Sequence, residues 1–311
     1  MRYCRRDLAP GACSMKRLLL LSAILLLASC ASSPKQSPGT DGPRILGVFA
    51  HPDDETGCAA TIYSVTHRLN GLCDLVCITD GQGGYKYSTL AEPLYGLRLT
   101  DEAIGRRELP AIRRREMLEA AEILGVNKVH FLNQPDHRYT QDEMEILDPS
   151  ANIWDTTFLK RRLRNIMVDG DYDFVLIMMP TVTTHGHHKA ASILALDVVN
   201  GLPLKQRPVI LGTQVLSADE QPEPYTGLAQ HPLTNPASAD AIFTFNRLKG
   251  FGHKDRLHLR IIVDWVIAAH KSQGTMQLAA GQGDLETFTL FAISPAGAMS
   301  ECRAFFKVLD N

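Results

Sequence analysis

Short apolar runs alternate with segments of helical periodicity along most of the chain. From residue 44 onward, runs such as RILGVFA, DLVCITDG, KVHFLN and FVLIMMPT are separated by helical patterns at 55–70, 110–124, 155–168 and 188–199. Strands that alternate with helices of this length are typical of βαβ units around a parallel sheet. The pattern therefore predicts an α/β fold of the Rossmann-like type, with three α/β/α layers and a mainly parallel sheet.

The pattern loosens toward the C-terminus. The segment 217–238 carries four prolines and little periodicity, and loops of this length inside a compact domain are often functional. We expect substrate specificity to depend on this segment and on 81–105. A last strand near 240–246 and a helix from about 254 to 272 are predicted to close the domain.

The N-terminal residues follow a different pattern. Lys16 and Arg17 precede an apolar stretch from Leu18 to Ala28, which is shorter than the roughly 20 apolar residues of a membrane-spanning helix. A basic start, a short apolar run and small residues at its end are typical of a secretory signal. The ending LASC also resembles the lipobox of bacterial lipoproteins, in which cleavage precedes a cysteine that receives lipid, here Cys30.

This interpretation divides the chain into a lipoprotein-type signal peptide at 1–29, a flexible tether at 30–43 and a folded domain at 44–311. The tether sequence is small, polar and interrupted by prolines. The resemblance implies a protein of the cell envelope, at the outer membrane or the periplasmic face, that contacts the membrane only through its lipid. A plain secretory signal in which Cys30 is incidental is the alternative, and Met15 could be the true start.

Composition excludes several classes of function. The 311 residues are 45% hydrophobic and 21% charged, with a formal net charge of −2, which is ordinary for a globular domain. No basic block follows the first forty residues, so we expect no nucleic-acid binding. The sequence contains no C-x-x-C pair and therefore no zinc-finger pattern.

Two polar clusters follow predicted strands. HPDDE at 51–55 comes directly after the first strand, and THGHHK at 184–189 follows FVLIMMPT. Ligands of parallel α/β sheets bind outside the carboxyl ends of the strands, so we expect both clusters to meet at one edge. Imidazoles and carboxylates are the ligands of Zn²⁺ and of non-haem Fe²⁺. The sequence therefore predicts a metal site.

The adjacent carboxylates of Asp53 and Asp54 are predicted to have different roles, because neighbouring side chains in an extended segment diverge. One would bind the metal and the other would act as general base beside the attacking water. Either aspartate could instead cap the following helix, and the histidines alone could belong to a polar loop. Neither alternative explains why histidines occur at both strand ends.

Three motifs together resemble the LmbE-like or PIG-L superfamily of metal-dependent N-acetylglucosaminyl deacetylases. They are AHPDDE, the pattern R-x-x-E-x-x-x-A-x-x-x-L-G and a later H-x-x-H. The resemblance covers 44–273 and includes TDG at 79–81, QPD at 134–136 and HKSQ at 270–273. It implies a zinc-dependent hydrolase that removes an N-acetyl or N-acyl group from an amino sugar or a related glycoconjugate.

The resemblance also implies one Zn²⁺ per chain, or another divalent metal, and a role for each of seven residues. These are His51, Asp54 and His188 as metal ligands, Asp53 as general base, a protonated His185 that stabilises the oxyanion, and Arg113 and Asp136 as substrate-binding residues. Arg113 has an alternative interpretation, because any arginine of RRRE could lie on a solvated helix surface.

The second histidine cluster departs from the family pattern. The family usually has H-P-D-H, whereas this chain has His185-Gly186-His187-His188. The change removes a carboxylate that could orient the histidines, and it makes His187 the alternative metal ligand. Two other functions stay open: an envelope lipoprotein that only binds glycans, and an Fe²⁺ oxygenase with two histidines and a carboxylate. Nothing in the sequence predicts the oligomeric state.

Overall fold

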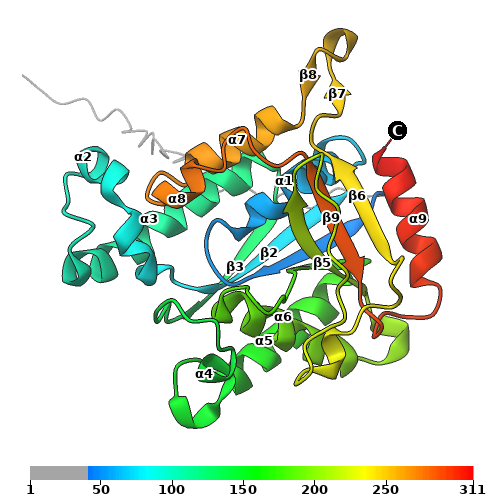
Figure 1. Ribbon diagram of the computed structural model, residues 1–311, viewed down its shortest axis with the longest axis horizontal. Coiled ribbons are helices and arrows are strands. Elements are labelled where there is room, and N and C mark those ends of the chain that lie inside the picture. Colours follow the sequence, from blue (N-terminus) through cyan, green and yellow to red (C-terminus); the bar gives the residue numbers. More distant parts are fainter. Residues whose placement is uncertain (1–40, 311) are drawn as a thin grey trace, which may run out of the picture. The chain divides into compact units, whose positions relative to one another are not determined.

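A seven-stranded sheet forms the centre of the computed structural model, which describes residues 41–310. The strand order is β3-β2-β1-β4-β5-β9-β6 (Figure 1). The five strands that pair in parallel are β1 (Arg44–Phe49), β2 (Leu72–Thr79), β3 (Lys128–Gln134), β4 (Phe174–Met178) and β5 (Val209–Leu216). Antiparallel pairing adds β9 (Leu285–Leu290) and β6 (Ile242–Asn246) at one edge. The predicted mainly parallel α/β fold is confirmed.

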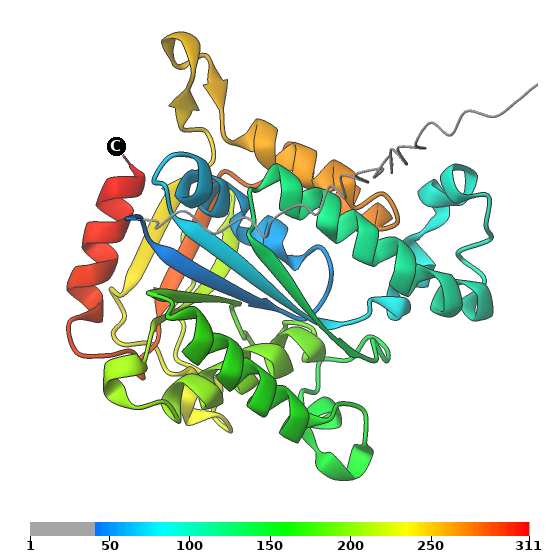
Figure 2. The ribbon, with the colours of Figure 1, turned by 180° about the vertical axis from the view of Figure 1, so that it is seen from behind.

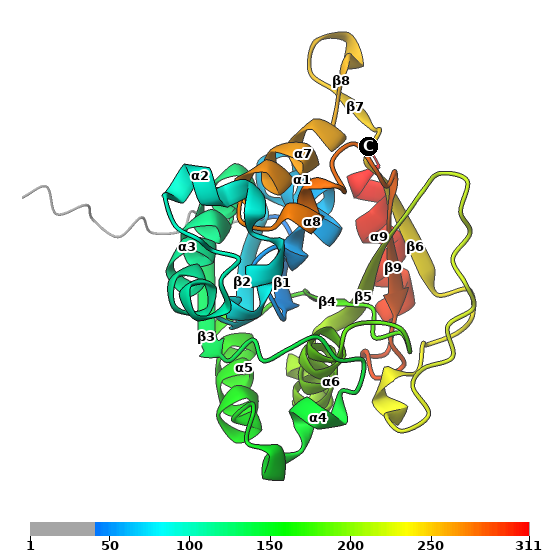
Figure 3. The same ribbon diagram turned by 60° about the vertical axis from the view of Figure 1, so that its left-hand side comes forward.

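Helices cover both faces of the sheet, which explains why β1 and β2 are mostly apolar and almost entirely buried. One face packs against α1 (Ala59–His67), α3 (Glu102–Ile123), α7 (Arg260–Ala269) and α9 (Ala298–Leu309). The other packs against α5 (Thr156–Gly170) and α6 (Gly186–Asn200) (Figure 3). Three short helices, α2 (Glu92–Tyr95), α4 (Met144–Leu147) and α8 (Gly274–Gln277), lie in the connections. The described residues thus supply hydrophobic partners for both faces of the sheet, and we expect this part of the chain to fold by itself.

Three element boundaries differ from the prediction. Helix α3 begins at Glu102 because Asp101 caps it, accepting hydrogen bonds from two backbone N–H groups, and Pro110 lies inside the helix. The predicted helix at 254–272 is the shorter α7, since positive φ angles at Gly252 and Lys254 form a hairpin before it. The strand near 240–246 is β6, but it is not the last, because β9 inserts between it and β5.

The strand order places both polar clusters at the carboxyl ends of two neighbouring strands. Strands β1 and β4 are neighbours, and the chain continues from β1 toward β2 and β3 on one side and from β4 toward β5 on the other. Such a reversal of strand order opens a crevice at the carboxyl ends, where ligands of α/β proteins bind. HPDDE follows β1 there, and THGHHK precedes and begins α6 after β4.

The predicted signal peptide and the lipidation at Cys30 lie outside the described residues. Within residues 41–310, no helix is both long and apolar enough to cross a membrane.

Candidate metal centre and active site

Three side chains from the two clusters bring their ligand atoms together. His51 Nδ1 lies 2.9 Å from His188 Nε2 and 3.8 Å from Asp54 Oδ2. Asp54 Oδ1 lies 3.2 Å from His188 Nε2. These are the three residues to which the family resemblance assigns metal ligation, and the fold brings His188 beside His51 and Asp54 across 137 residues of sequence.

The spacing and chemistry of this group fit a zinc ion. Bonds of about 2.0–2.2 Å in a tetrahedron place neighbouring ligand atoms roughly 3.3–3.6 Å apart. The three observed separations lie on both sides of that range. Two imidazoles and one carboxylate form a common ligand set of catalytic zinc, which leaves a fourth position open. The same set also suits non-haem Fe²⁺. The ligand set therefore indicates a metal site but does not identify the metal.

Asp54 is fixed in place by the backbone. Its Oδ2 atom accepts hydrogen bonds from the N–H groups of Ala50 at 3.0 Å and His51 at 2.9 Å. Burial raises the pKa of Asp54, but the neighbouring His188 and His51 outweigh burial and hold the pKa well below its usual range. Asp54 is therefore ionised, with Oδ1 facing His188, as a metal ligand must be.

His51 is held from behind by a second carboxylate. Its Nε2 atom, on the opposite side of the ring from the ligand atom Nδ1, lies 3.6 Å from Asp136 Oδ1. Burial lowers the pKa of His51, but Asp136 and Asp54 outweigh burial and raise it to about 10. Metal binding requires the neutral ligand and would release this proton. Asp136 thus supplies an orienting carboxylate of the kind that the altered second cluster lacks.

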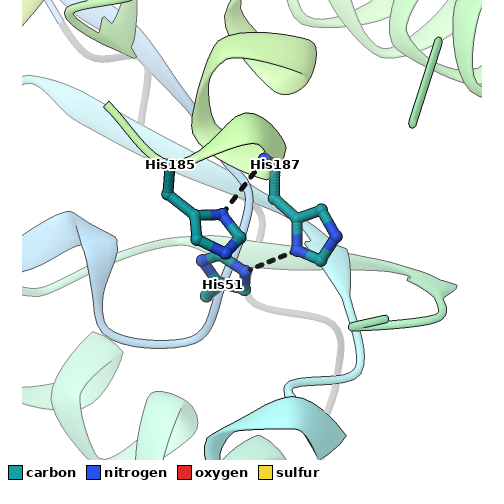
Figure 4. A group of neighbouring side chains, drawn as sticks. All are labelled: His51, His185 and His187. Atoms are coloured by element: carbon teal, nitrogen blue, oxygen red, sulfur yellow. Dashed lines mark hydrogen bonds between the residues drawn. The ribbon is translucent and has the colours of Figure 1, made fainter. Parts of the chain in front are cut away.

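His187 lies behind His51 rather than at the cavity. Figure 4 shows the side chains of His185 and His187 reaching from the start of α6 toward His51. His187 is fully buried, and its Nδ1 atom lies 3.1 Å from His51 Nε2 and 3.3 Å from Asp136 Oδ1. The trio His51, His185 and His187 is a second group that could hold a metal. It contains no carboxylate, and His187, unlike His188, does not line the cavity.

His185 is arranged to be a neutral hydrogen-bond donor. Its Nδ1 atom accepts a hydrogen bond of 3.1 Å from the backbone N–H of His187 and so caps α6, which leaves the ring proton on Nε2. Burial, reinforced by the neighbouring His51 and His187, lowers the pKa of His185 to about 3. This environment favours a neutral ring over the predicted protonated form, because a positive charge there would be desolvated beside other imidazoles. A neutral ring can still donate from Nε2.

Asp53 has a strained backbone and a pKa close to neutrality. Its φ of 137° is one that residues with side chains rarely adopt, a strain of about 1–3 kcal/mol that surrounding contacts must hold. Burial raises the pKa of Asp53 to about 6, against the opposing charge of Arg113. Such a carboxylate is ionised at neutral pH and still basic enough to accept a proton. These properties suit the predicted general base.

Arg113 is buried, lines the cavity and binds other parts of the protein with its guanidinium group. Its Nη2 atom donates to the carbonyl of Pro52 at 2.6 Å and lies 3.1 Å from Asp53 Oδ2. Its Nη1 atom donates to the carbonyl of Gly81 at 2.9 Å. The alternative of a solvated surface arginine is therefore wrong. Contact of Arg113 and Asp136 with substrate stays a prediction, while their observed partners include Asp53 and His51.

Glu55 and His270 form a fully buried pair that we did not predict as part of the site. His270 Nε2 lies 2.5 Å from Glu55 Oε1, and Glu55 Oε2 accepts the backbone N–H of Asp53 at 3.1 Å. Burial lowers the pKa of His270, but Glu55 outweighs burial and raises it. The available signal was the occurrence of Glu55 in HPDDE and of His270 in HKSQ. Through the hydrogen bond from the Asp53 N–H group to Glu55, the pair holds the strained backbone of Asp53 in place.

Replacing Glu55 should therefore destabilise the domain strongly. In Glu55→Ala, His270 loses its carboxylate partner inside the core and Asp53 loses its acceptor, so we expect the free energy of unfolding to fall by about 3–5 kcal/mol. Urea denaturation measures the change. Glu119→Ala is the matched control, because its pair with Lys271 is exposed and should contribute no more than about 1 kcal/mol. Equal stability of both variants would contradict the role of the pair.

A cavity of about 780 Å³ opens in front of these residues. His51, Asp54 and His188 line it, together with Asp53 and His185. Its outer wall carries three tyrosines and three cationic side chains: Tyr85, Tyr87, Tyr139, Lys86, Arg106 and Arg138.

The two segments expected to set specificity differ in position. Residues 83–87 from the segment 81–105 line the cavity, whereas the cavity lining within residues 41–310 includes none from 217–238. The segment 217–238 packs instead on residues near the cluster THGHHK. His231 contacts Glu143 at 3.0 Å, and the Tyr225 hydroxyl donates to the carbonyl of Pro180. These contacts place the segment outside the cavity wall, and its expected role in substrate specificity stays a prediction.

Comparison with known proteins finds a family pattern over the part of the chain that contains this site. Residues 46–199 match the model of the PIG-L family, described as GlcNAc-PI de-N-acetylase. This match contains both polar clusters. The chain is also 27% identical over 166 residues to a probable N-acetyl-alpha-D-glucosaminyl L-malate deacetylase 2 of Bacillus anthracis. That alignment covers 53% of this chain and 63% of the relative, so it spans less than two thirds of the relative's length.

One solved structure supports the fold, and a second is reported as a similar chain. A deacetylase from the biosynthesis pathway of teicoplanin matches with a TM-score of 0.50 and 16% identity, over 80% of this chain and 97% of the other. The N,N'-diacetylchitobiose deacetylase of Pyrococcus horikoshii matches with a TM-score of 0.48 and 19% identity, over 83% and 87% of the two chains. Residues 46–199 therefore carry the sequence pattern of the PIG-L family, and the chain shares the α/β fold of the teicoplanin-pathway deacetylase.

Proposed function

We propose that the protein is a zinc-dependent hydrolase that removes an N-acetyl or N-acyl group from an amino sugar. The observation that carries this proposal is the group His51, Asp54 and His188, which converges beside the carboxylate of Asp53 in an open cavity. The match to the PIG-L family model and the deacetylase named for the Bacillus relative support the reaction class.

The chain's own residues supply the proton transfers. A zinc ion held by His51, Asp54 and His188 would act as a Lewis acid and make water a better nucleophile at neutral pH. Asp53 accepts the proton of the attacking water, and returning it to the nitrogen makes the amine a good leaving group. The Nε2–H group of His185 donates a hydrogen bond to the oxygen that becomes negative. Arg113 and Glu55 hold Asp53 in its strained conformation throughout.

The cavity favours a substrate larger than a free amino sugar. A volume of about 780 Å³ lies in the range of sites that enclose drug-sized ligands, roughly 300–1,000 Å³. Three tyrosines in its wall provide flat surfaces that are apolar on the face and polar at the hydroxyl. We therefore propose a glycoconjugate substrate, with the N-acetylated sugar at the metal and the remainder along the tyrosines.

The expected cellular context follows from the N-terminal sequence. If Cys30 receives lipid, the enzyme acts in the cell envelope on wall, lipopolysaccharide or scavenged glycans. The lipobox-like LASC and the tether composition at 30–43 support this part of the proposal.

A metal and substrate assay tests the reaction. Protein carrying residues 31–311 is loaded with Zn²⁺ or Fe²⁺, and amine release is measured on N-acetylated mono- and disaccharides and their glycosides. We expect amine release with zinc, fastest on glycosides. Oxygen consumption with iron would indicate the oxygenase instead. Sugar binding without metal and without amine release would indicate a glycan-binding protein.

A further inference from the structure

A small hairpin projects from the domain on the side away from the cavity. Strands β7 (Gly250–Phe251) and β8 (Leu257–His258) form a separate two-stranded sheet just before α7. Figures 1 and 2 show the hairpin standing out beyond the helical layer. Its tip, 252–256, is almost entirely exposed. A surface of this kind is not needed to position the metal ligands.

Cationic side chains and leucines occur together on this hairpin. Residues 248–258 contain Lys249, Lys254 and Arg256 with one acid, Asp255. Lys254 and Arg256 are exposed and Lys249 is half-buried. In the part of the chain that the structure describes, none of the three has a carboxylate oxygen within 4.0 Å of its side-chain nitrogens. Leu248 and Leu257 are 43% and 47% exposed. Positive charge next to exposed apolar side chains is the composition of surfaces that bind anionic lipid membranes.

The base of the hairpin extends the basic surface to the domain body. Phe251 packs near Tyr63 of α1, with ring centroids 6.4 Å apart. Arg68, just after α1, donates to the carbonyl of Leu309 at the end of α9 and is close enough to Lys249 to lower its pKa, after burial. The acid Asp310 partly offsets this charge.

The preceding part of the chain joins the domain at the same end. Gly42 lies against the backbone of Leu69 and Gly71, directly after Arg68, and the N–H group of Leu72 donates to the carbonyl of Pro43. The forty residues before this point include the apolar run 18–28 and the tether. Six residues of β1 separate this end from the metal site, a distance of roughly 20 Å.

We propose that this end of the domain docks on an anionic lipid membrane through the hairpin surface, which we define as Arg68, Leu248, Lys249, Lys254, Arg256 and Leu257. The cations bind lipid headgroups and the two leucines enter the interface. Docking there brings the end of the domain that residues 41–43 join into contact with the bilayer. The cavity then faces away from the bilayer. A nucleic-acid surface is disfavoured, because the net charge of the chain is −2 and leucines separate the cations.

Vesicle binding of residues 31–311, which lack the predicted signal, tests the proposal. The vesicles contain phosphatidylcholine alone, or phosphatidylcholine and phosphatidylglycerol in a ratio of three to one. We expect binding only to the anionic vesicles, lost in about 1 M salt, where the Debye length is about 3 Å. The triple variant Lys249→Gln, Lys254→Gln and Arg256→Gln should bind about a hundredfold more weakly.

Two further variants keep the test decisive. Lys160→Gln and Arg161→Gln on α5, combined with Lys205→Gln in the turn after α6, remove the same charge away from the hairpin, and this variant should bind like the unaltered protein. Leu248→Ser with Leu257→Ser should weaken vesicle binding without changing binding to a soluble polyanion such as heparin. Equal binding of both charge variants would overturn the proposal. Vesicle binding unaffected by the leucine changes would also overturn it, in favour of a general polyanion surface. Thermal unfolding confirms that each variant is folded.

Discussion

Asp53→Asn is expected to lower kcat/KM for amide hydrolysis about a thousandfold while leaving zinc affinity unchanged. A positioned general base contributes typically 10²–10⁴-fold to such a rate, and asparagine cannot accept the proton. The proposed metal ligands His51, Asp54 and His188 are untouched by the change. Steady-state amine release and competitive zinc titration measure the two quantities.

The control for Asp53→Asn is thermal unfolding, because Arg113 loses a charged partner in the variant. Its hydrogen bonds to the carbonyls of Pro52 and Gly81 remain, so we expect a folded protein. Full activity of Asp53→Asn would show that another group is the base. Loss of zinc would show instead that Asp53 is itself a ligand.

His188→Ala is expected to weaken zinc binding by more than about a hundredfold and to abolish turnover at micromolar zinc. Loss of a residue that only orients a ligand typically costs 10–100-fold in metal affinity, and His188 contributes one of the three converging ligand atoms. A competitive titration against a zinc-binding dye, with the metal content of the purified protein, measures the effect.

His187→Ala is the matched comparison, because it removes a neighbouring imidazole from the same helix. We expect only about a tenfold loss of affinity, since His187 contacts His51 from behind. The opposite order, with zinc lost in His187→Ala and kept in His188→Ala, would identify the second group of three histidines as the metal site.

The location of the site could be predicted from the sequence. Alternation of strands and helices fixes the direction of each strand, and the carboxyl ends of β1 and β4 then receive HPDDE and THGHHK. The convergence of His51 with His188 follows from this arrangement. Predicting the location of the site requires only local sequence patterns and the general preference of α/β folds for binding ligands at strand ends.

The supporting contacts could not be predicted, because they depend on long-range packing. Asp136 approaches His51 only after β3 joins the sheet beside β2, and His270 reaches Glu55 from the end of α7. The strained backbone of Asp53 could not be predicted from the sequence either, because no local pattern favours a φ of 137° in an aspartate. Strand β9 was missed for the same reason, as its partners β5 and β6 are distant in sequence.

The charge of His185 depends on burial in the same way. In sequence the residue is one of three histidines in a polar stretch, where protonation is reasonable. In the structure, desolvation and neighbouring imidazoles lower its pKa to about 3. The surroundings therefore favour a neutral His185 that can still donate from Nε2.

The most direct test of the account is a zinc titration of metal-stripped protein with acetate release as the readout. We predict that the stripped protein releases no acetate from an N-acetylglucosamine glycoside. Activity should then rise linearly with added zinc and level off at one ion per chain. Full activity of the stripped protein, or no acetate release at any zinc concentration across the substrate panel, would contradict the account.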